Sequence, residues 1–515
     1  AENVAVGAES LENNTTGNEN VAVGYRALEA NTTGATNTAI GDRTLASNTT
    51  ASNNTAVGNN ALVENTTGHS NNAVGATALD ANTTGNGLNA FGYGALGANT
   101  TADGNSAFGH ETLLANTTGA DNTAIGKEAL KANTTGESNV AVGSQSLDAN
   151  TTGLNNVAIG RQALDNNTTG SRNVAVGTNT LDANTTAGNN TAVGDGSLKA
   201  NTTGADNTAV GMGSLDSATT ASYNTAVGRS ALQATTTNGS STAVGAYALN
   251  VNTGASNTAV GSFALDANTS AAHNTAVGES ALGANTTGTE NTSVGAGSLD
   301  ANTTANSSTA MGYLSLSGNT TGAANTAFGH RALLANTTAQ YNTAVGQASL
   351  EANTTGAECT AIGRSALGSN TTGSSNTSLG TYAGLHVTTG GGNTLVGHAA
   401  GAQSVNLTTG SNNTIVGFQC RTAASDNDAS IVLGFGVTGV GTRNFTFGDG
   451  STDSNIAAGA TSITAPSDIR LKEDIQDEEV GLNFINDLRP VTFQWKKEKD
   501  IPSEMKAYKE GSEER

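Results

Sequence analysis

The chain has 515 residues, of which 36% are hydrophobic, 4% aromatic and 12% charged, and its formal net charge is −21. So few aromatic side chains exclude the large cores of ordinary globular domains, and so few charges exclude the usual charge-rich disordered segment. The acidic balance argues against nucleic acid as a partner. No apolar run approaches the roughly 18 residues of a membrane helix, so we expect no membrane segment.

Glycine recurs at a fixed spacing from Gly7 to Gly397. These 24 glycines are separated by 23 intervals; 22 of them equal the step from Gly7 to Gly24, and one, Gly245 to Gly261, is a single residue shorter. So strict a register indicates units that stack on one another in a single way, as in solenoid proteins. The chain begins inside a repeat, so we expect it to be part of a longer protein.

A clean copy of the repeat is Y-R-A-L-E-A-N-T-T-G-A-T-N-T-A-I-G at residues 25–41. Its residues 37–40 have strand character, and a second short β segment is predicted around Ala27 and Leu28. The N-T-T-G stretch is turn chemistry. We expect the Val or Ile before each glycine, and the Leu four residues after it, to point inward.

The pattern predicts an all-β rod, a parallel β-roll or β-helix in which each repeat forms one coil. Helix is disfavoured because Gly and Asn-Thr-Thr recur too often. Parallel coils stack about 4.8 Å apart. Identical side chains then lie above one another, so Asn and Thr ladders are expected to add hydrogen bonds along the axis.

The N-T-A-I-G motif at residues 37–41 and its copies resemble the head repeats of trimeric autotransporter adhesins, which are left-handed parallel β-rolls. The unit here is longer than the usual adhesin repeat. The resemblance implies a homotrimer, which composition alone does not show.

The fifth residue after the glycine is often acidic, and Asp148, Asp165 and Asp182 occupy it in three successive coils. Lys131 and Lys199 hold the same column on either side of that run. Two interpretations stay open: a cation-binding stripe, or a solvated column partly balanced by lysines, which we favour. The other acidic members of the column are Glu12, Glu29, Asp80, Asp216, Asp266, Asp300 and Glu351.

The rest of the repeat carries no expected catalytic, metal or cofactor site. The six His residues form no recurring ligand set. Each N-T-T also matches a glycosylation acceptor, but its role in the turn already explains the residues. Exposed tyrosines such as Tyr93 and Tyr313 can contact sugars or proteins, although single exposed aromatics are common.

The organisation changes towards the C-terminus. We predict a repeat shaft over residues 1–386, an irregular β neck over 387–466, and a small α+β segment over 467–515. The last segment holds the only Trp and two of the three Pro. Within it, Val480–Leu488 is patterned as a short amphipathic helix and Val491–Trp495 alternates like a strand.

The segment S-D-I-R-L-K-E-D-I at 467–475 resembles the opening of the intramolecular chaperone auto-processing domain. That domain ends phage tailspikes, tail fibres and endosialidases, and it also occurs in a family of eukaryotic membrane-bound transcription factors. A second block, from Gly481 to Lys496, continues the resemblance. The resemblance is confined to the segment 467–515, and the glycine-rich downstream block of the family does not follow.

The resemblance implies that the domain trimerises, guides folding of the rod and cuts itself off between Pro466 and Ser467. Ser467 would be the nucleophile and Lys472 its base, with Asp468 and Arg470 as supporting residues. A Lys can take a Ser proton only where burial or a nearby cation lowers its pKa, and Arg470 would supply such a charge. Ser-Asp is also a common helix start, but the second block favours the dyad.

These features predict a homotrimeric fibre shaft that attaches to a host or other surface, with a self-cleaving chaperone acting once on its own chain. The receptor would be a glycan or a protein, and the location a virion tail fibre or the extracellular cell surface. The alternative is a bacterial trimeric surface adhesin without self-cleavage. A glycan-degrading tailspike is disfavoured, because such enzymes need paired carboxylates in a groove.

Overall fold

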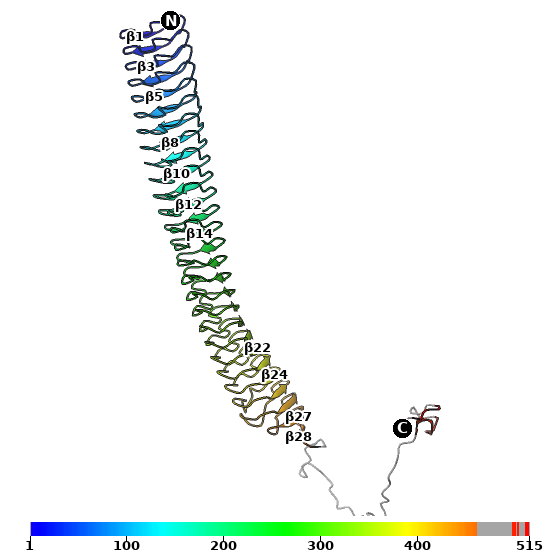
Figure 1. Cartoon of the computed structure of the whole chain (residues 1–515). Helices are drawn as coiled ribbons and strands as arrows, with labels where there is room; N and C mark the ends of the chain where they lie inside the picture. Colours follow the sequence, from blue (N-terminus) through cyan, green and yellow to red (C-terminus); the bar gives the residue numbers. More distant parts are fainter. Residues whose placement is uncertain (1, 461–496, 501, 504–509, 514–515) are drawn as a thin grey trace, which may run out of the picture. The chain divides into compact units, whose positions relative to one another are not determined.

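The computed structural model describes residues 2–460, 497–500, 502–503 and 510–513. The chain divides into two units, Ala1–Thr464 and Ala465–Arg515. The first unit is a rod of stacked coils in which every coil contributes one short strand (Figure 1). The described residues contain strands, turns and one short 3₁₀ helix, and no α-helix.

The strands run in chain order along the rod. They are β1 (Val4–Val6), β2 (Val21–Val23), β3 (Thr38–Ile40), β4 (Thr55–Val57), β5 (Asn72–Val74), β6 (Asn89–Phe91), β7 (Ser106–Phe108), β8 (Thr123–Ile125), β9 (Val140–Val142), β10 (Val157–Ile159), β11 (Val174–Val176), β12 (Thr191–Val193), β13 (Thr208–Val210), β14 (Thr225–Val227), β15 (Thr242–Val244), β16 (Thr258–Val260), β17 (Thr275–Val277), β18 (Thr292–Val294), β19 (Thr309–Met311), β20 (Thr326–Phe328), β21 (Thr343–Val345), β22 (Thr360–Ile362), β23 (Thr377–Leu379), β24 (Thr394–Val396), β25 (Thr414–Val416), β26 (Ile431–Gly434), β27 (Asn444–Gly448) and β28 (Ser454–Ala457). The 3₁₀ helix η2 spans Glu498–Asp500.

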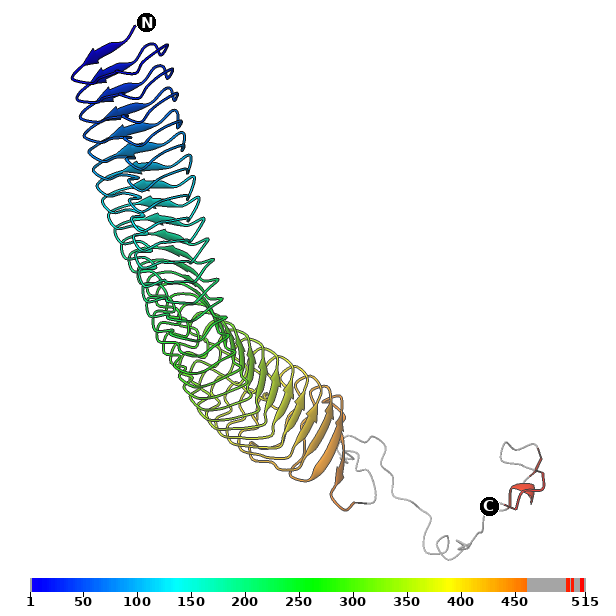
Figure 2. The ribbon, with the colours of Figure 1, turned by 45° about the horizontal axis from the view of Figure 1, so that its top comes forward.

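Each strand from β1 to β26 pairs in parallel with the strand that follows it, so the repeat becomes a single continuous sheet. Ala39 pairs with Ala56, for example, and Thr394 pairs with Thr414 across the longer coil that follows Gly397. Figure 2 shows the sheet running the length of the rod. The all-β parallel solenoid predicted from the glycine spacing is confirmed.

The direction of the strand side chains differs from the prediction. The middle residue of the strand, usually Ala, is fully buried, whereas the Val or Ile before the glycine points outward; Ala39 is 0% exposed and Ile40 41%. A strand alternates its side chains between two faces, so burying Ala39 turns Ile40 to the surface. The Leu four residues after the glycine is inward as expected, and Leu28 is fully buried.

The predicted second β segment, around Ala27 and Leu28, is wrong. Residues 25–30 form a turn in which Arg26 and Leu28 take left-handed backbone angles, with φ of 57° and 54°. Such angles cost a non-glycine residue about 1 kcal/mol. Stacking offsets that cost, because the Leu28 side chain is buried and its N–H donates to the Thr44 carbonyl at 3.0 Å.

The predicted Asn ladders are present, and two of them run inside the rod. In the first, Nδ2 of Asn48 donates to Oδ1 of Asn31 at 2.9 Å and to the carbonyl of Ala51 at 3.1 Å. In the second, the backbone N–H of Asn37 donates to Oδ1 of Asn20 at 3.0 Å. All of these Asn side chains are fully buried, so they tie neighbouring coils together without leaving the turn unpaired.

The Thr ladder is also present, at the surface of the same turn. Oγ1 of Thr151 donates to the carbonyl of Thr168 at 3.0 Å, and the bond repeats in most coils. The hydroxyl thus adds to the hydrogen bonds that run along the axis, as predicted.

The far end of the sheet is closed by a hairpin. β27 pairs in parallel with β26 on one edge and antiparallel with β28 on the other. The turn between β27 and β28 is held by Asp449, whose carboxylate accepts hydrogen bonds from the hydroxyl and N–H of Ser451 and the N–H of Thr452. These donors lower the pKa of Asp449 to about 2. The hairpin therefore covers an edge that would otherwise be open for pairing.

Candidate functional site

The predicted cleavage site follows the capped end of the solenoid. β28 ends at Ala457, and the predicted cut after Pro466 lies a short way further along the chain. Pro466, Ser467, Asp468, Arg470 and Lys472 all lie outside the described residues. The dyad therefore stays a prediction, and so do the helix at 480–488 and the strand at 491–495.

Two of the three short described stretches of the C-terminal unit contact each other. Lys497 and Lys499 both form ion pairs with Glu513, and these hydrogen bonds lower the pKa of the Glu513 carboxyl. The N–H of Lys499 also donates to the carbonyl of Ser512. The stretches 497–500 and 510–513 are thus joined.

The acidic column is half-buried where three Asp residues follow one another. Burial, together with the carboxylates of Asp148 and Asp182 on either side, raises the pKa of Asp165 to about 6. At the ends of this run, Lys131 acts to lower the pKa of Asp148, and Lys199 that of Asp182, although burial leaves both raised. The central Asp165 is therefore the member whose charge is most disfavoured.

Replacing Asp165 with Asn is expected to stabilise the rod at neutral pH. The folded pKa of about 6 lies above the ordinary value of 3.8, so the folded state holds the proton longer than the unfolded chain. Parent stability should therefore fall as the pH rises from about 4 to about 6 and stay lower above it. The variant should lack this fall. At pH 7 its free energy of unfolding should exceed that of the parent by about 1 kcal/mol, after allowing for solvent screening of a half-buried group.

The measurement is urea unfolding of parent and variant at several pH values between 4 and 8. Asp216→Asn is the matched control, because Asp216 occupies the same column between Lys199 and Gln233 rather than between two acids. A gain for Asp165→Asn that is the same at pH 4 and pH 7 would contradict the electrostatic explanation.

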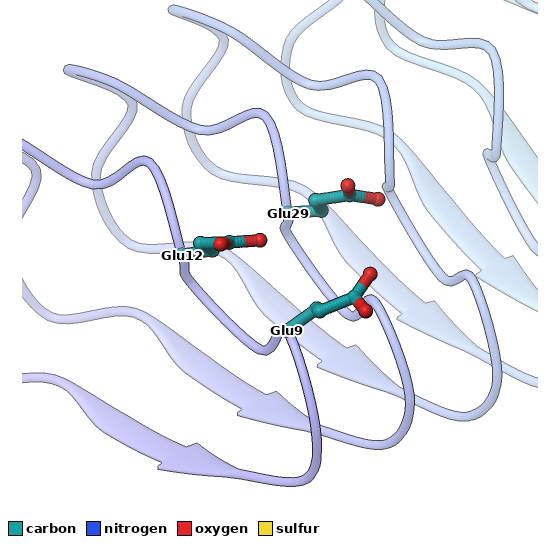
Figure 3. A group of neighbouring side chains, drawn as sticks. All are labelled: Glu9, Glu12 and Glu29. Carbon is teal, nitrogen blue, oxygen red and sulfur yellow. The ribbon is translucent and has the colours of Figure 1, made fainter.

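A second acidic group lies on the first two coils. One carboxylate oxygen from each of Glu9, Glu12 and Glu29 lies within 4.8 Å of the other two (Figure 3). The guanidinium of Arg26 pairs with two of the three, with Nε 2.5 Å from a carboxylate oxygen of Glu9 and 3.6 Å from one of Glu29. Arg26 therefore neutralises part of the cluster. The sequence pattern placed Glu12 and Glu29 in the acidic column but missed Glu9, which belongs to the second position after the glycine.

Several exposed aromatic side chains are stacked rather than scattered. Tyr93 stacks on His110 with ring centroids 5.3 Å apart, and Tyr313 stacks on His330 at 5.6 Å. The two members of each pair stand one repeat apart in the sequence, which is the signal that would have found them. Beside Tyr93 lies a shallow hollow of about 520 Å³, also lined by Asp80, Gly94 and Gly97.

The hollow beside Tyr93 is lined by two glycines of one turn, which have no side chains to fill it. Gly94 and Gly97 occupy positions where most coils carry larger residues, and the Leu114 side chain of the next coil forms one wall. Burial raises the pKa of Asp80, which forms another part of the lining. A phenol ring beside a carboxylate suits a polar ligand with an apolar face.

No helix among the described residues is long and apolar enough to cross a membrane.

Part of the C-terminal unit matches a known protein family. Residues 467–509 match the model of a family described as chaperone of endosialidase, whose name classes it as a peptidase. No curated protein matched the chain. The match begins at Ser467, the residue after the predicted cut. A long parallel β-solenoid followed by a chaperone-of-endosialidase segment fits a tail fibre or tailspike with a C-terminal chaperone domain.

Proposed function

We propose that the chain is the shaft of a homotrimeric fibre for attachment to a host or other surface, and that its C-terminal chaperone assists folding and then cleaves itself off. Residues 1–386 would form the shaft, 387–466 the neck, and 467 onwards the chaperone. The observation that carries the proposal is the junction: the family match starts at Ser467, shortly after the hairpin that closes the solenoid. The fibre would act on a virion tail or at a cell surface.

The rod explains the need for a chaperone. Each coil buries little besides one Leu, one or two Ala and two Asn, so no coil is stable without a neighbour. Long-range parallel pairing is slow to nucleate, because chain entropy is lost before the contacts form. A trimerising domain at one end would hold three chains together while the first coils form there.

The cleavage chemistry follows from the two residue types. Oγ of Ser467 would attack the carbonyl carbon of Pro466 while the neutral amine of Lys472 takes its proton. The peptide C–N bond then breaks, the Ser467 nitrogen receives that proton, and Pro466 is left as an ester on the Ser467 oxygen. Water hydrolyses the ester to a Pro466 carboxyl group and restores the Ser467 hydroxyl. One water is consumed, and the enzyme acts once on its own chain.

The test is the intact mass of the chain, expressed with any residues that its gene encodes after Arg515, beside a Ser467→Ala variant. A shaft product ending at Pro466 in the parent and absent from the variant would support the proposal. Lys472→Met should block the cut as well, because the hydroxyl then lacks a base. An uncut parent with a folded C-terminal domain would remove the self-cleaving part and leave the trimeric surface adhesin, which the repeat motif favours.

A further inference from the structure

An outward apolar column runs along the sheet from β1 to β27. In every one of these coils the residue before the glycine is Val, Ile, Leu, Met or Phe. These side chains remain accessible in the single chain: Ile159 is 41% exposed, Phe108 39% and Phe328 53%. We call this column, from Val6 to Phe447, the pre-glycine stripe.

The face that carries the stripe has no charged residue. The first residue of each strand from β1 to β26, two before the stripe residue, also points outward; it is Thr, Val, Asn, Ser or Ile, and never Asp, Glu, Lys or Arg. The same is true of Phe445, its counterpart in β27. Elsewhere the chain carries 63 such residues and a net charge of −21. A face this long without a single charged residue indicates that a partner molecule covers it.

The size of the face can be estimated from strand geometry. Strands about 4.8 Å apart and three residues wide, at about 3.3 Å per residue, give roughly 1,200 Å² over the 27 coils. The stripe makes up about half of that area. The whole face exceeds the roughly 800 Å² that each partner buries in a typical stable complex.

A second copy of this chain is the partner that fits the stripe. A partner must match a repeat of about 4.8 Å over the full length of the rod, and an identical solenoid does so coil by coil. Acidic copies repel one another through their other surfaces, whereas the uncharged face lets them approach. Phe91 and Phe108 are bulky members of the stripe, and their ring centroids lie 4.9 Å apart. When two copies align in register, each of these rings faces the same residue of the other copy.

We propose that the pre-glycine stripe is the surface through which parallel, in-register copies of the shaft pack together. This inference rests on the proposed fibre and names the face by which its copies associate. Charged residues that follow the glycine, such as Lys127 and Arg161, form the rim of the contact.

Site-directed cross-linking of the full chain tests the surface. Ile159→Cys places a thiol on the stripe, and Leu154→Cys places one in the same coil on the loop before the strand. The two parent side chains are 41% and 38% exposed, so the thiols are matched in accessibility. The native Cys359 and Cys420 are free but buried, so the parent gives the background.

With a short bis-maleimide, Ile159→Cys should give covalent dimers in a yield roughly tenfold above Leu154→Cys, because packing holds the thiols at a high effective concentration. Peptide mapping should find position 159 linked to position 159, which reports parallel register. A higher yield at position 154, or links from 159 to other coils, would overturn the inference.

A charged variant gives a second readout. Val142, Ile159 and Val176 point outward from consecutive strands, so changing all three to Asp should leave the circular dichroism of the coils unchanged while lowering the association of the shafts. The mass of the assembly in solution separates the two proposals. If the parent is a trimer, the variant with three Asp is also a trimer and Ile159→Cys gives no 159–159 link, the stripe is not the interface, but the proposed fibre stands. If the parent is a monomer, both proposals are wrong.

Discussion

Replacing Gly143 with alanine is expected to disrupt the coils on either side and to cost at least ~4 kcal/mol of stability. Gly143 has a φ of 139°, which L side chains rarely adopt. An added Cβ would lie 2.6 Å from the carbonyl carbon of Gly160 in the next coil and closer still to its oxygen. The backbone of Gly160 cannot retreat, because its own N–H is bonded to the Val142 carbonyl at 2.8 Å.

Gly87→Ala is the matched control for that prediction. Gly87 also has positive φ, 66°, but an added Cβ would meet nothing within 4 Å. Other coils place Glu19, Thr36 or Ser70 at the equivalent position, so a side chain there is tolerated. The cost should be about 1 kcal/mol, the strain of a left-handed residue. Equal losses of melting temperature in the two variants, followed by circular dichroism, would show that the close approach of the coils is not what requires Gly143.

The glycine spacing alone was enough to predict the coil length and the parallel, in-register stack. The direction of the strand side chains was predicted wrongly, because the larger apolar residue was assigned to the interior. The repeat does hold a signal for the correct assignment. The middle residue stays Ala or Ser until Leu395, as a narrow interior requires, whereas its neighbour ranges from Val23 to Phe328, as only an open surface allows.

The turn that carries Leu28 could not be predicted from local preferences. A left-handed Leu is disfavoured in isolation, and it is held there by burial and by bonds to the next coil. The stacking of Tyr93 on His110 likewise depends on the period, since the two residues are far apart in sequence but one coil apart in space. The predicted dyad rests on the sequence motif alone, because Ser467 and Lys472 lie outside the described residues.

Replacing Asn150 with alanine is expected to cost about 3 kcal/mol, because it removes three hydrogen bonds from a fully buried site. Nδ2 of Asn150 donates to Oδ1 of Asn133 at 2.9 Å and to the carbonyl of Gly153 at 3.0 Å. Its Oδ1 accepts from Nδ2 of Asn167 at 2.8 Å. The variant leaves the carboxamide oxygen of Asn133 without this donor, and the stack should separate into two blocks that unfold at different urea concentrations.

The control is Asn166→Ala, one position before the ladder. Asn166 is exposed, bonds only at the surface through Asp182, and other coils place Ala149 or Ala183 there, so its loss should change stability by less than about 0.5 kcal/mol. Urea unfolding of the three proteins would separate the ladder from a general effect of losing Asn. Equal stability of the Asn150→Ala variant and the parent would mean that the ladder fixes the register without adding stability.

The chain contains natural breaks in the same ladder. Within the described residues, the buried carboxamide oxygens of Asn201 and Asn370 have no hydrogen-bond partner. In each case the next coil offers an apolar side chain, Ala218 or Val387, where the ladder needs an amide donor. An unpaired buried acceptor costs about 1–3 kcal/mol. Asn150→Ala would create the same defect at a coil where the ladder is intact.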